Sequence, residues 1–246
     1  MINVLVLYRR YTLTRQPQKK LALVTGASRG IGAGIAKELA NAGTHVILLA
    51  RTIGSLEEID DEIKKNGGSS TIVAMDLLDY SAIDRLGASI FERWGKLDIL
   101  IGNAAVLGQL TPIHHYDPTI WDEVIGVNLT ANYRLLRSLD PLLRISEKGR
   151  IIFLSSDVSD GLHPYWGAYA VSKSALETMV STYAKETERL ALQINIVDPG
   201  PTGTKLRAGA FPGENQRQIQ TPEIAAQFIC EVIFNKETEH GAIVKR

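Results

Sequence analysis

The chain has 246 residues, of which 45% are hydrophobic and 22% are charged. Basic and acidic residues number 27 each, so nothing indicates a nucleic acid or a charged membrane surface as a partner. No apolar run approaches the ~20 residues that span a bilayer. The single cysteine, Cys230, excludes an internal disulfide and fits a reducing, cytoplasmic location.

The first twenty residues differ from the rest of the chain. Residues 1–8 are mostly apolar, basic residues follow, and no acid occurs before Glu38. A secretory signal has the reverse order of charge and apolar stretch. We expect residues 1–20 to form a flexible appendage, or to reflect a start site assigned too far upstream. An organelle transit peptide is the alternative.

From residue 21 onwards, strand-like apolar runs alternate with helical segments. The expected strands span residues 21–25, 46–50, 71–75, 97–101, 150–155, 193–197 and 242–244. The expected helices span residues 33–42, 55–66, 81–94, 118–145 (interrupted at Pro141), 165–190 and 221–234. This alternation predicts an α/β fold, a doubly wound parallel sheet of Rossmann type, in one domain over residues 21–246.

Three glycines, Gly26, Gly30 and Gly32, follow the first expected strand. Without side chains they let the backbone turn sharply and approach a pyrophosphate, whose charge then lies at the positive N-terminus of the next helix. The spacing Gly-x3-Gly-x-Gly differs from the common Gly-x-Gly-x-x-Gly, and an ordinary structural turn is the alternative. The strand–turn–helix context favours a dinucleotide site.

Charges near the second expected strand bear on which dinucleotide is bound. NAD sites usually place an acid at the end of that strand, but no acid occurs between Glu38 and Glu57. Arg51 follows the strand and Arg29 lies in the glycine turn, and two guanidinium groups suit a 2′-phosphate. We therefore expect NADP, although both arginines are also consistent with solvated surface positions. Asp76, after the third strand, is placed to accept a hydrogen bond from the adenine amino group.

Tyr169 and Lys173 lie four residues apart in a run of helix formers, so they share one helix face. A phenol has a pKa near ~10, and an ammonium group held close to it favours the phenolate and lowers that pKa. Such pairs also arise by chance. Ser156, thirteen residues before Tyr169, ends the fifth expected strand, where a hydroxyl can polarise a carbonyl or merely satisfy the local backbone.

Four motifs in chain order resemble those of the short-chain dehydrogenase/reductase family, from Leu21 almost to the C-terminus. They are Thr25-Gly26-x3-Gly30-x-Gly32, Asn103-Ala104-Ala105, Ser156 with Tyr169-x3-Lys173, and Pro199-Gly200-x3-Thr204. The resemblance implies that Tyr169 is the acid/base and that Ser156 steadies the substrate oxygen. It implies that Lys173 lowers the pKa of Tyr169 and holds the nicotinamide ribose, and that Asn128 holds a water in a proton relay.

The resemblance also implies where NADP is bound and how the chain assembles. The expected cofactor contacts are Thr25, Gly26, Ser28, Arg29, Gly30, Ile31, Gly32, Arg51, Asp76, Leu77, Asn103, Ala104, Ala105, Tyr169, Lys173, Pro199, Gly200, Thr202 and Thr204. The family's usual Asn-Asn-Ala-Gly is Gly102-Asn103-Ala104-Ala105 here, where Ala105 is expected to crowd the cofactor slightly. We expect a homodimer or homotetramer, with surplus apolar surface on the 165–190 helix from Ala175, Leu176, Met179, Val180 and Tyr183.

These observations predict an NADP(H)-dependent oxidoreductase that interconverts a small-molecule carbonyl and a secondary alcohol, a 3-oxoacyl thioester being one compatible substrate. The alternative is a binding protein that senses NADP(H) without turnover. His114-His115 lacks partners at ligand spacing, so no metal site is expected. Tyr165 and Trp166 are expected to line the pocket or core, Asp157 to contact substrate or cap the turn, and Phe211-Pro212-Gly213 to form part of a mobile lid.

Overall fold

The computed structural model describes residues 19–235 and 237–246, so residues 1–18 of the expected appendage lie outside it. Seven parallel strands form one sheet in the order β3-β2-β1-β4-β5-β6-β7. They are β1 (Leu21–Thr25), β2 (His45–Ala50), β3 (Ser69–Ala74), β4 (Ile99–Gly102), β5 (Gly149–Leu154), β6 (Leu192–Asp198) and β7 (Ile243–Lys245). The predicted Rossmann-type fold is confirmed.

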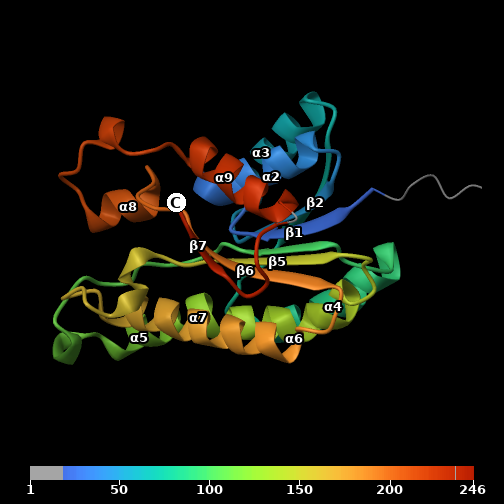
Figure 1. The fold of residues 1–246 in the computed structure, drawn as a ribbon. Helices are drawn as coiled ribbons and strands as arrows, with labels where there is room; N and C mark the ends of the chain where they lie inside the picture. Colours follow the sequence, from blue (N-terminus) through green and yellow to red (C-terminus); the bar gives the residue numbers. More distant parts are fainter. Residues whose placement is uncertain (1–18, 236) are drawn as a thin grey trace, which may run out of the picture.

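Helices cover both faces of this sheet (Figure 1). One layer holds α2 (Gly30–Asn41), α3 (Ile53–Lys65) and α9 (Pro222–Phe234). The other holds α4 (Tyr80–Trp94), α5 (Pro118–Ile125), α6 (Ala131–Leu143) and α7 (Gly167–Glu186). The connections contain α8 (Lys205–Ala210) and the short turns η1 (Ile113–His115), η3 (Asp157–Asp160) and η4 (Gln216–Gln218). Within the described residues, no helix combines the length and apolar character needed to cross a membrane.

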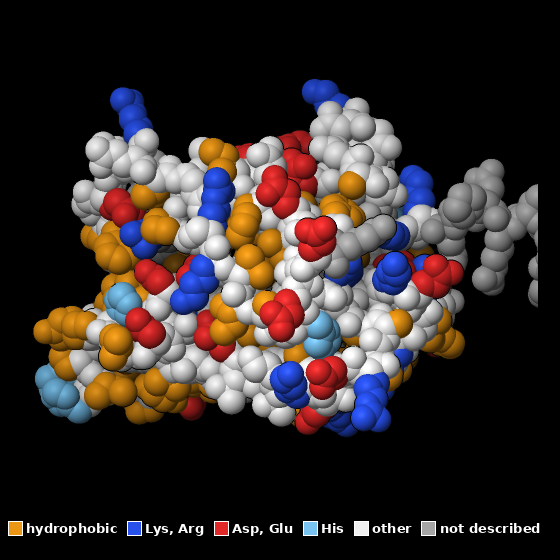
Figure 2. All heavy atoms as spheres, viewed as in Figure 1, with side chains coloured by type: hydrophobic (Ala, Val, Ile, Leu, Met, Phe, Trp, Pro, Cys, Tyr) orange, Lys and Arg blue, Asp and Glu red, His pale blue; other side chains and the backbone are white. Residues whose placement is uncertain are grey.

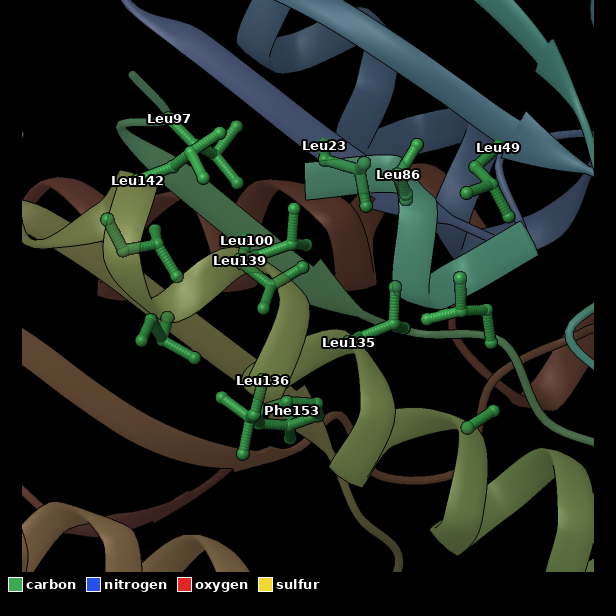
Figure 3. Close-up of a cluster of buried hydrophobic side chains, with 14 of the residues drawn as sticks. Leu23, Leu49, Leu86, Leu97, Leu100, Leu135, Leu136, Leu139, Leu142 and Phe153 are labelled. Atoms are coloured by element: carbon green, nitrogen blue, oxygen red, sulfur yellow. The ribbon is translucent and has the colours of Figure 1, made fainter. Parts of the chain in front are cut away.

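Each face of the sheet buries its own hydrophobic core. Figure 3 shows the core under α4 and α6, where Leu136 lies against Phe153 and Leu97 lies close to Leu142. The strands are buried on both faces, which explains why β1, Leu-Ala-Leu-Val-Thr, reads as a continuous rather than alternating apolar run. The two cores fix the strands, and therefore hold the loops at their carboxyl ends.

The expected 118–145 helix is interrupted at a different place from the one predicted. Pro141 lies inside α6, and the irregularity is a π-helical segment, η2 (Gly126–Thr130), between α5 and α6. Pro141 has no N–H to donate to the carbonyl oxygen one turn before it, and α6 ends two residues after it, at Leu143. Segments of π-helix often accompany functional residues, and Asn128 lies at the centre of this one.

Helix α7 exposes less apolar surface than the sequence predicts. Leu176 and Val180 are completely buried in the chain's own core, and Met179 and Tyr183 pack against that core. The prediction failed because the 3.6-residue period alone does not show how broad a stripe the sheet covers. Val171, 42% exposed, is the large apolar side chain that α7 presents to solvent.

Candidate active site

A cleft of about 790 Å³ opens at the carboxyl ends of the strands. It spans the switch point where β1 lies between β2 and β4, the position at which doubly wound sheets bind ligands. Figure 1 shows this end of the sheet beneath α8. In Figure 2 apolar side chains gather on both sides of the hollow at the left, with charged side chains between them.

One end of the cleft is the glycine turn between β1 and α2. Gly26 and Gly30 have φ values of +66° and +57°, a left-handed conformation that glycine adopts without strain. A side chain at Gly26 would lie 2.8 Å from Nδ2 of Asn103, and one at Gly32 would collide with the Gly26 carbonyl oxygen. The close approach of these backbone segments therefore requires glycine.

The residues of this turn fit the pyrophosphate of a dinucleotide. Helix α2 begins without a capping side chain and without an acid in its first turn. Its first N–H groups thus have no side-chain partner, and Gly30 and Ile31 present this helix end to the cleft. Free N–H groups and the positive end of the helix dipole together favour an anion.

Polar side chains at the same end of the cleft suit the adenosine part of a cofactor. Arg29 and Arg51 both line the cleft, as the sequence predicted for a 2′-phosphate site. Asp76 also lines it, and its Oδ1 accepts a hydrogen bond of 3.0 Å from the backbone N–H of Leu78. That hydrogen bond fixes the carboxylate at the end of β3.

Thr25 joins the glycine turn to the end of β4. Its hydroxyl donates to the carbonyl oxygen of Ile101 over 3.2 Å and accepts from the backbone N–H groups of Asn103 and Ala104 over 3.0 and 3.1 Å. Nδ2 of Asn103 in turn donates to the carbonyl oxygen of Thr25 over 2.8 Å. Thr25 is buried and braces the cleft wall from behind.

The predicted catalytic residues converge further along the same cleft. Ser156 follows β5, and Tyr169 and Lys173 lie one turn apart on α7. Tyr169 and Lys173 are only 6% and 3% exposed. The ammonium group of Lys173 donates a hydrogen bond of 2.7 Å to the carbonyl oxygen of Leu154, which ties α7 to the end of β5.

The pKa values differ from the sequence-based expectation. Burial, with the charges of Asp157 and Asp198, raises the pKa of Tyr169 above that of a free phenol, and hydrogen bonding to Ser156 only partly offsets this rise. Burial also lowers the pKa of Lys173 to about 8. Lys173 is not among the groups that shift the pKa of Tyr169 in this structure, so its lowering of the phenol pKa stays a prediction.

Asn128 lies behind the site rather than in it. Its Oδ1 accepts from the Val106 N–H over 2.9 Å, and its Nδ2 donates to the Val106 carbonyl oxygen and to Oγ of Ser172, both over 3.0 Å. The Ser172 hydroxyl donates to the Tyr169 carbonyl oxygen over 2.7 Å. The Asn128 side chain therefore links three elements: η2, α7 and the loop after β4. The predicted water relay through Asn128 stays a prediction.

The far end of the cleft is apolar and aromatic. The ring of Trp166 lies 5.8 Å from that of Tyr169 and 5.7 Å from that of Phe211, measured between ring centres. Arg207 stacks 3.9 Å from the centre of the Phe211 ring and makes two hydrogen bonds to Glu214, of 2.8 and 2.6 Å. The contact between Trp166 and Phe211 joins the segment after β6, which contains α8, to the start of α7.

The structure brings together nearly all the residues that the sequence singled out. The lining includes every expected catalytic and cofactor residue except Thr25, Gly32 and Asn128, which brace it from behind. Tyr165 is instead 60% exposed and lines a neighbouring groove, so it is part of neither the catalytic cleft nor the core. Sequence reasoning missed Asp198, a buried carboxyl in the lining whose pKa burial raises. Asp198 ends β6, and because ligands bind at the carboxyl ends of strands in such sheets, this position could have indicated a site residue.

Comparison with known proteins identifies the family. A family model described as short chain dehydrogenase matches residues 20–215. The chain therefore belongs to the short-chain dehydrogenase family of oxidoreductases, as the four motifs indicated.

Similar proteins support this assignment. "Uncharacterized oxidoreductase YciK" of Escherichia coli strain K12 is 36% identical over 206 residues, which cover 82% of this chain and 81% of that protein. A short-chain dehydrogenase of Shigella flexneri 2a strain 301, solved in complex with NADP, is 32% identical with a TM-score of 0.88, covering 94% of this chain and 99% of that one. One from Escherichia coli CFT073, complexed with NADPH, is 33% identical with a TM-score of 0.86 and the same coverage.

Proposed function

We propose that this protein is an NADP(H)-dependent oxidoreductase that interconverts a small carbonyl compound and a secondary alcohol. One observation carries the proposal: Ser156, Tyr169 and Lys173 line the same cleft as the uncapped end of α2 and the two arginines. A dinucleotide lying along this cleft would have its phosphates at the glycine turn and its nicotinamide near Tyr169.

NADP is favoured over NAD for two reasons. Arg29 and Arg51 line the end of the cleft where the adenosine would lie, and the segment after β2 holds no acid that would take a free ribose hydroxyl. The solved relatives from Shigella flexneri and Escherichia coli contain NADP and NADPH. Lys173, Asn103 and the segment from Pro199 to Thr204 line the same cleft, and we expect them to hold the nicotinamide half.

The bound cofactor supplies or accepts the hydride, and the chain's own residues manage the proton. In reduction the Tyr169 hydroxyl would give its proton to the carbonyl oxygen, and NADPH held in the cleft would supply the hydride to the carbonyl carbon, so that the products would be the alcohol and NADP⁺. Solvent then reprotonates the phenol. The raised pKa of Tyr169 keeps it protonated at neutral pH, which suits its role as a proton donor. The neighbouring rings of Trp166 and Phe211 would limit the access of water once substrate is bound.

A substrate panel tests this function directly. Purified protein with NADPH would be assayed for loss of cofactor absorbance with a ketone, an aldehyde and a 3-oxoacyl thioester, whose acyl chain would suit the apolar end of the cleft. We expect turnover of at least one carbonyl compound, and turnover at least about 10²-fold slower by the Tyr169→Phe variant. Tight NADPH binding without any turnover would favour the alternative, a protein that senses the cofactor.

Assembly and location also belong to this proposal. We propose a homodimer or homotetramer, supported by family resemblance and by large apolar side chains that remain exposed on the α6 and α7 layer, Tyr133 and Val171. Light scattering that gives a stable monomer at micromolar concentration would contradict it. We propose a cytoplasmic location because the one thiol, Cys230, is free and buried; cell fractionation tests this.

A further inference from the structure

The hydroxyl of Ser156 is already engaged in the structure. It donates a hydrogen bond of 2.9 Å to Oδ1 of the neighbouring Asp157. A serine hydroxyl has one proton, so Ser156 cannot give that proton to Asp157 and to a substrate oxygen at the same time. The group expected to stabilise the developing oxyanion thus has a competitor beside it.

Asp157 is a carboxylate in the cleft without a cation of its own. It lines the cleft, and among residues 19–235 and 237–246 no lysine, arginine or histidine forms an ion pair with it. Arg207 is close enough for Asp157 to raise its pKa, but its guanidinium group is held by Glu214. His163 lies 3.6 Å from a different acid, Asp160. The carboxylate of Asp157 therefore remains available to a ligand.

An unneutralised carboxylate at this position opposes carbonyl reduction. Negative charge develops on the substrate oxygen in the transition state, next to Ser156, and the neighbouring carboxylate disfavours it, although solvent screens part of this effect because Asp157 is exposed. The same carboxylate contributes to the raised pKa of Tyr169. Both effects diminish if the substrate itself donates a hydrogen bond to Asp157, because the donor draws charge from the carboxylate and weakens its hold on the Ser156 proton.

We propose that Asp157 selects carbonyl substrates that carry a hydroxyl or ammonium group on the carbon next to the carbonyl. Oδ1 of Asp157 lies 2.9 Å from Oγ of Ser156, so a donor one carbon from the reacting centre would be within reach of Asp157 when the carbonyl oxygen lies at Ser156 and Tyr169. The rest of the molecule would be apolar, because Leu107, Trp166 and Phe211 line the space beyond. This proposal rests on the function proposed above and names its substrate class.

Four aromatic ketones test the proposal: acetophenone and its derivatives that carry a hydroxyl, an amino or a methoxy group on the methyl carbon next to the carbonyl. The methoxy compound keeps the electron-withdrawing oxygen of the hydroxy compound but cannot donate a hydrogen bond, so it separates recognition from intrinsic reactivity. With the wild type and NADPH, we expect kcat/KM for the hydroxy and amino ketones to exceed that for the methoxy ketone by about 10- to 100-fold.

The variant Asp157→Asn keeps the shape of the side chain and removes its charge. It should reduce that preference to about threefold or less and raise turnover of acetophenone, because the opposing charge is gone, while NADPH affinity is unchanged. Asp160→Asn is the matched control: it lies in the same turn, outside the cleft lining, and should keep the wild-type preference.

The outcomes separate this proposal from the function on which it rests. Wild-type enzyme that reduces acetophenone and the methoxy ketone as well as the donor-bearing ketones would overturn the role of Asp157 and leave the proposed function intact. An equal loss with all four ketones in Asp157→Asn would also overturn it, since a merely structural residue would behave so. If NADPH binds but no carbonyl compound is reduced in either panel, the proposed function fails and this proposal fails with it.

Discussion

The ammonium nitrogen of Lys173 lies 5.7 Å from the centre of the Tyr169 ring, and its hydrogen bond goes to the backbone instead of the phenol. Proximity on one helix face, which the four-residue spacing predicts, therefore does not place the two functional atoms in contact. The Lys173 side chain is buried, so its charge costs free energy that the fold must supply.

This cost predicts a pH-dependent stability. Lys173 releases its proton near pH 8 in the folded protein and near its ordinary pKa of 10.5 when unfolded. Between these values the unfolded chain binds more protons, so raising the pH stabilises the fold through this group. Lys173→Met lacks the effect. The free energy of unfolding of Lys173→Met minus that of the wild type should be largest below pH 8. This difference should decrease by roughly 2–4 kcal/mol between pH 8 and pH 10.5.

Urea denaturation of both proteins from pH 7 to 10.5 measures this difference. Because the other titrating groups are common to both proteins, their effects largely cancel in the comparison. A difference that does not change with pH would show that the pKa of Lys173 is not lowered in the folded state. Lys173→Met should in any case lose turnover.

Arg51→Glu should weaken NADPH binding by about 1.5–3 kcal/mol and leave NADH binding nearly unchanged, because only NADPH carries the 2′-phosphate. Isothermal titration with both cofactors measures the two affinities. Arg189→Glu makes the same charge change at an exposed position after α7 and should alter neither. A wild-type protein that binds NADH as tightly as NADPH would contradict the preference.

Thr25→Val should destabilise the protein, although valine has the shape of threonine. The substitution leaves the N–H groups of Asn103 and Ala104 without the hydroxyl that accepts from them, at a cost of about 1–3 kcal/mol. Thr182→Val, an exposed change on α7, should stay within about 0.5 kcal/mol. Equal denaturation midpoints for the two variants would show that the Thr25 hydroxyl does not stabilise the cleft wall.

The sequence predicts the fold and most of the cleft because local patterns determine both. Buried parallel strands read as continuous apolar runs, and the glycines of the β1–α2 turn are required where the backbone segments approach closely. These features depend on neighbours in the chain. The strand bounds differ by only a few residues, as at β4, which begins at Ile99 instead of Leu97.

Interactions between distant segments could not be predicted in the same way. Lys173 donates its hydrogen bond to a backbone carbonyl. Every residue has such a carbonyl, so residue types alone do not show which one accepts the bond. The contact of Phe211 with Trp166 depends on how the segment after β6 lies against the start of α7. The pKa of Tyr169 depends on desolvation, which only the packed structure defines.

The central claim is that Tyr169 donates the proton in an NADPH-dependent carbonyl reduction, and single-turnover NADPH oxidation by Tyr169→Phe tests it most directly. The variant should bind NADPH as the wild type does, while its rate falls by at least about 10²–10⁴-fold, the usual contribution of a general acid. Tyr133→Phe, at an exposed tyrosine of α6, should retain the wild-type rate. A folded Tyr169→Phe enzyme that reduces its substrate at a near-normal rate would contradict the account.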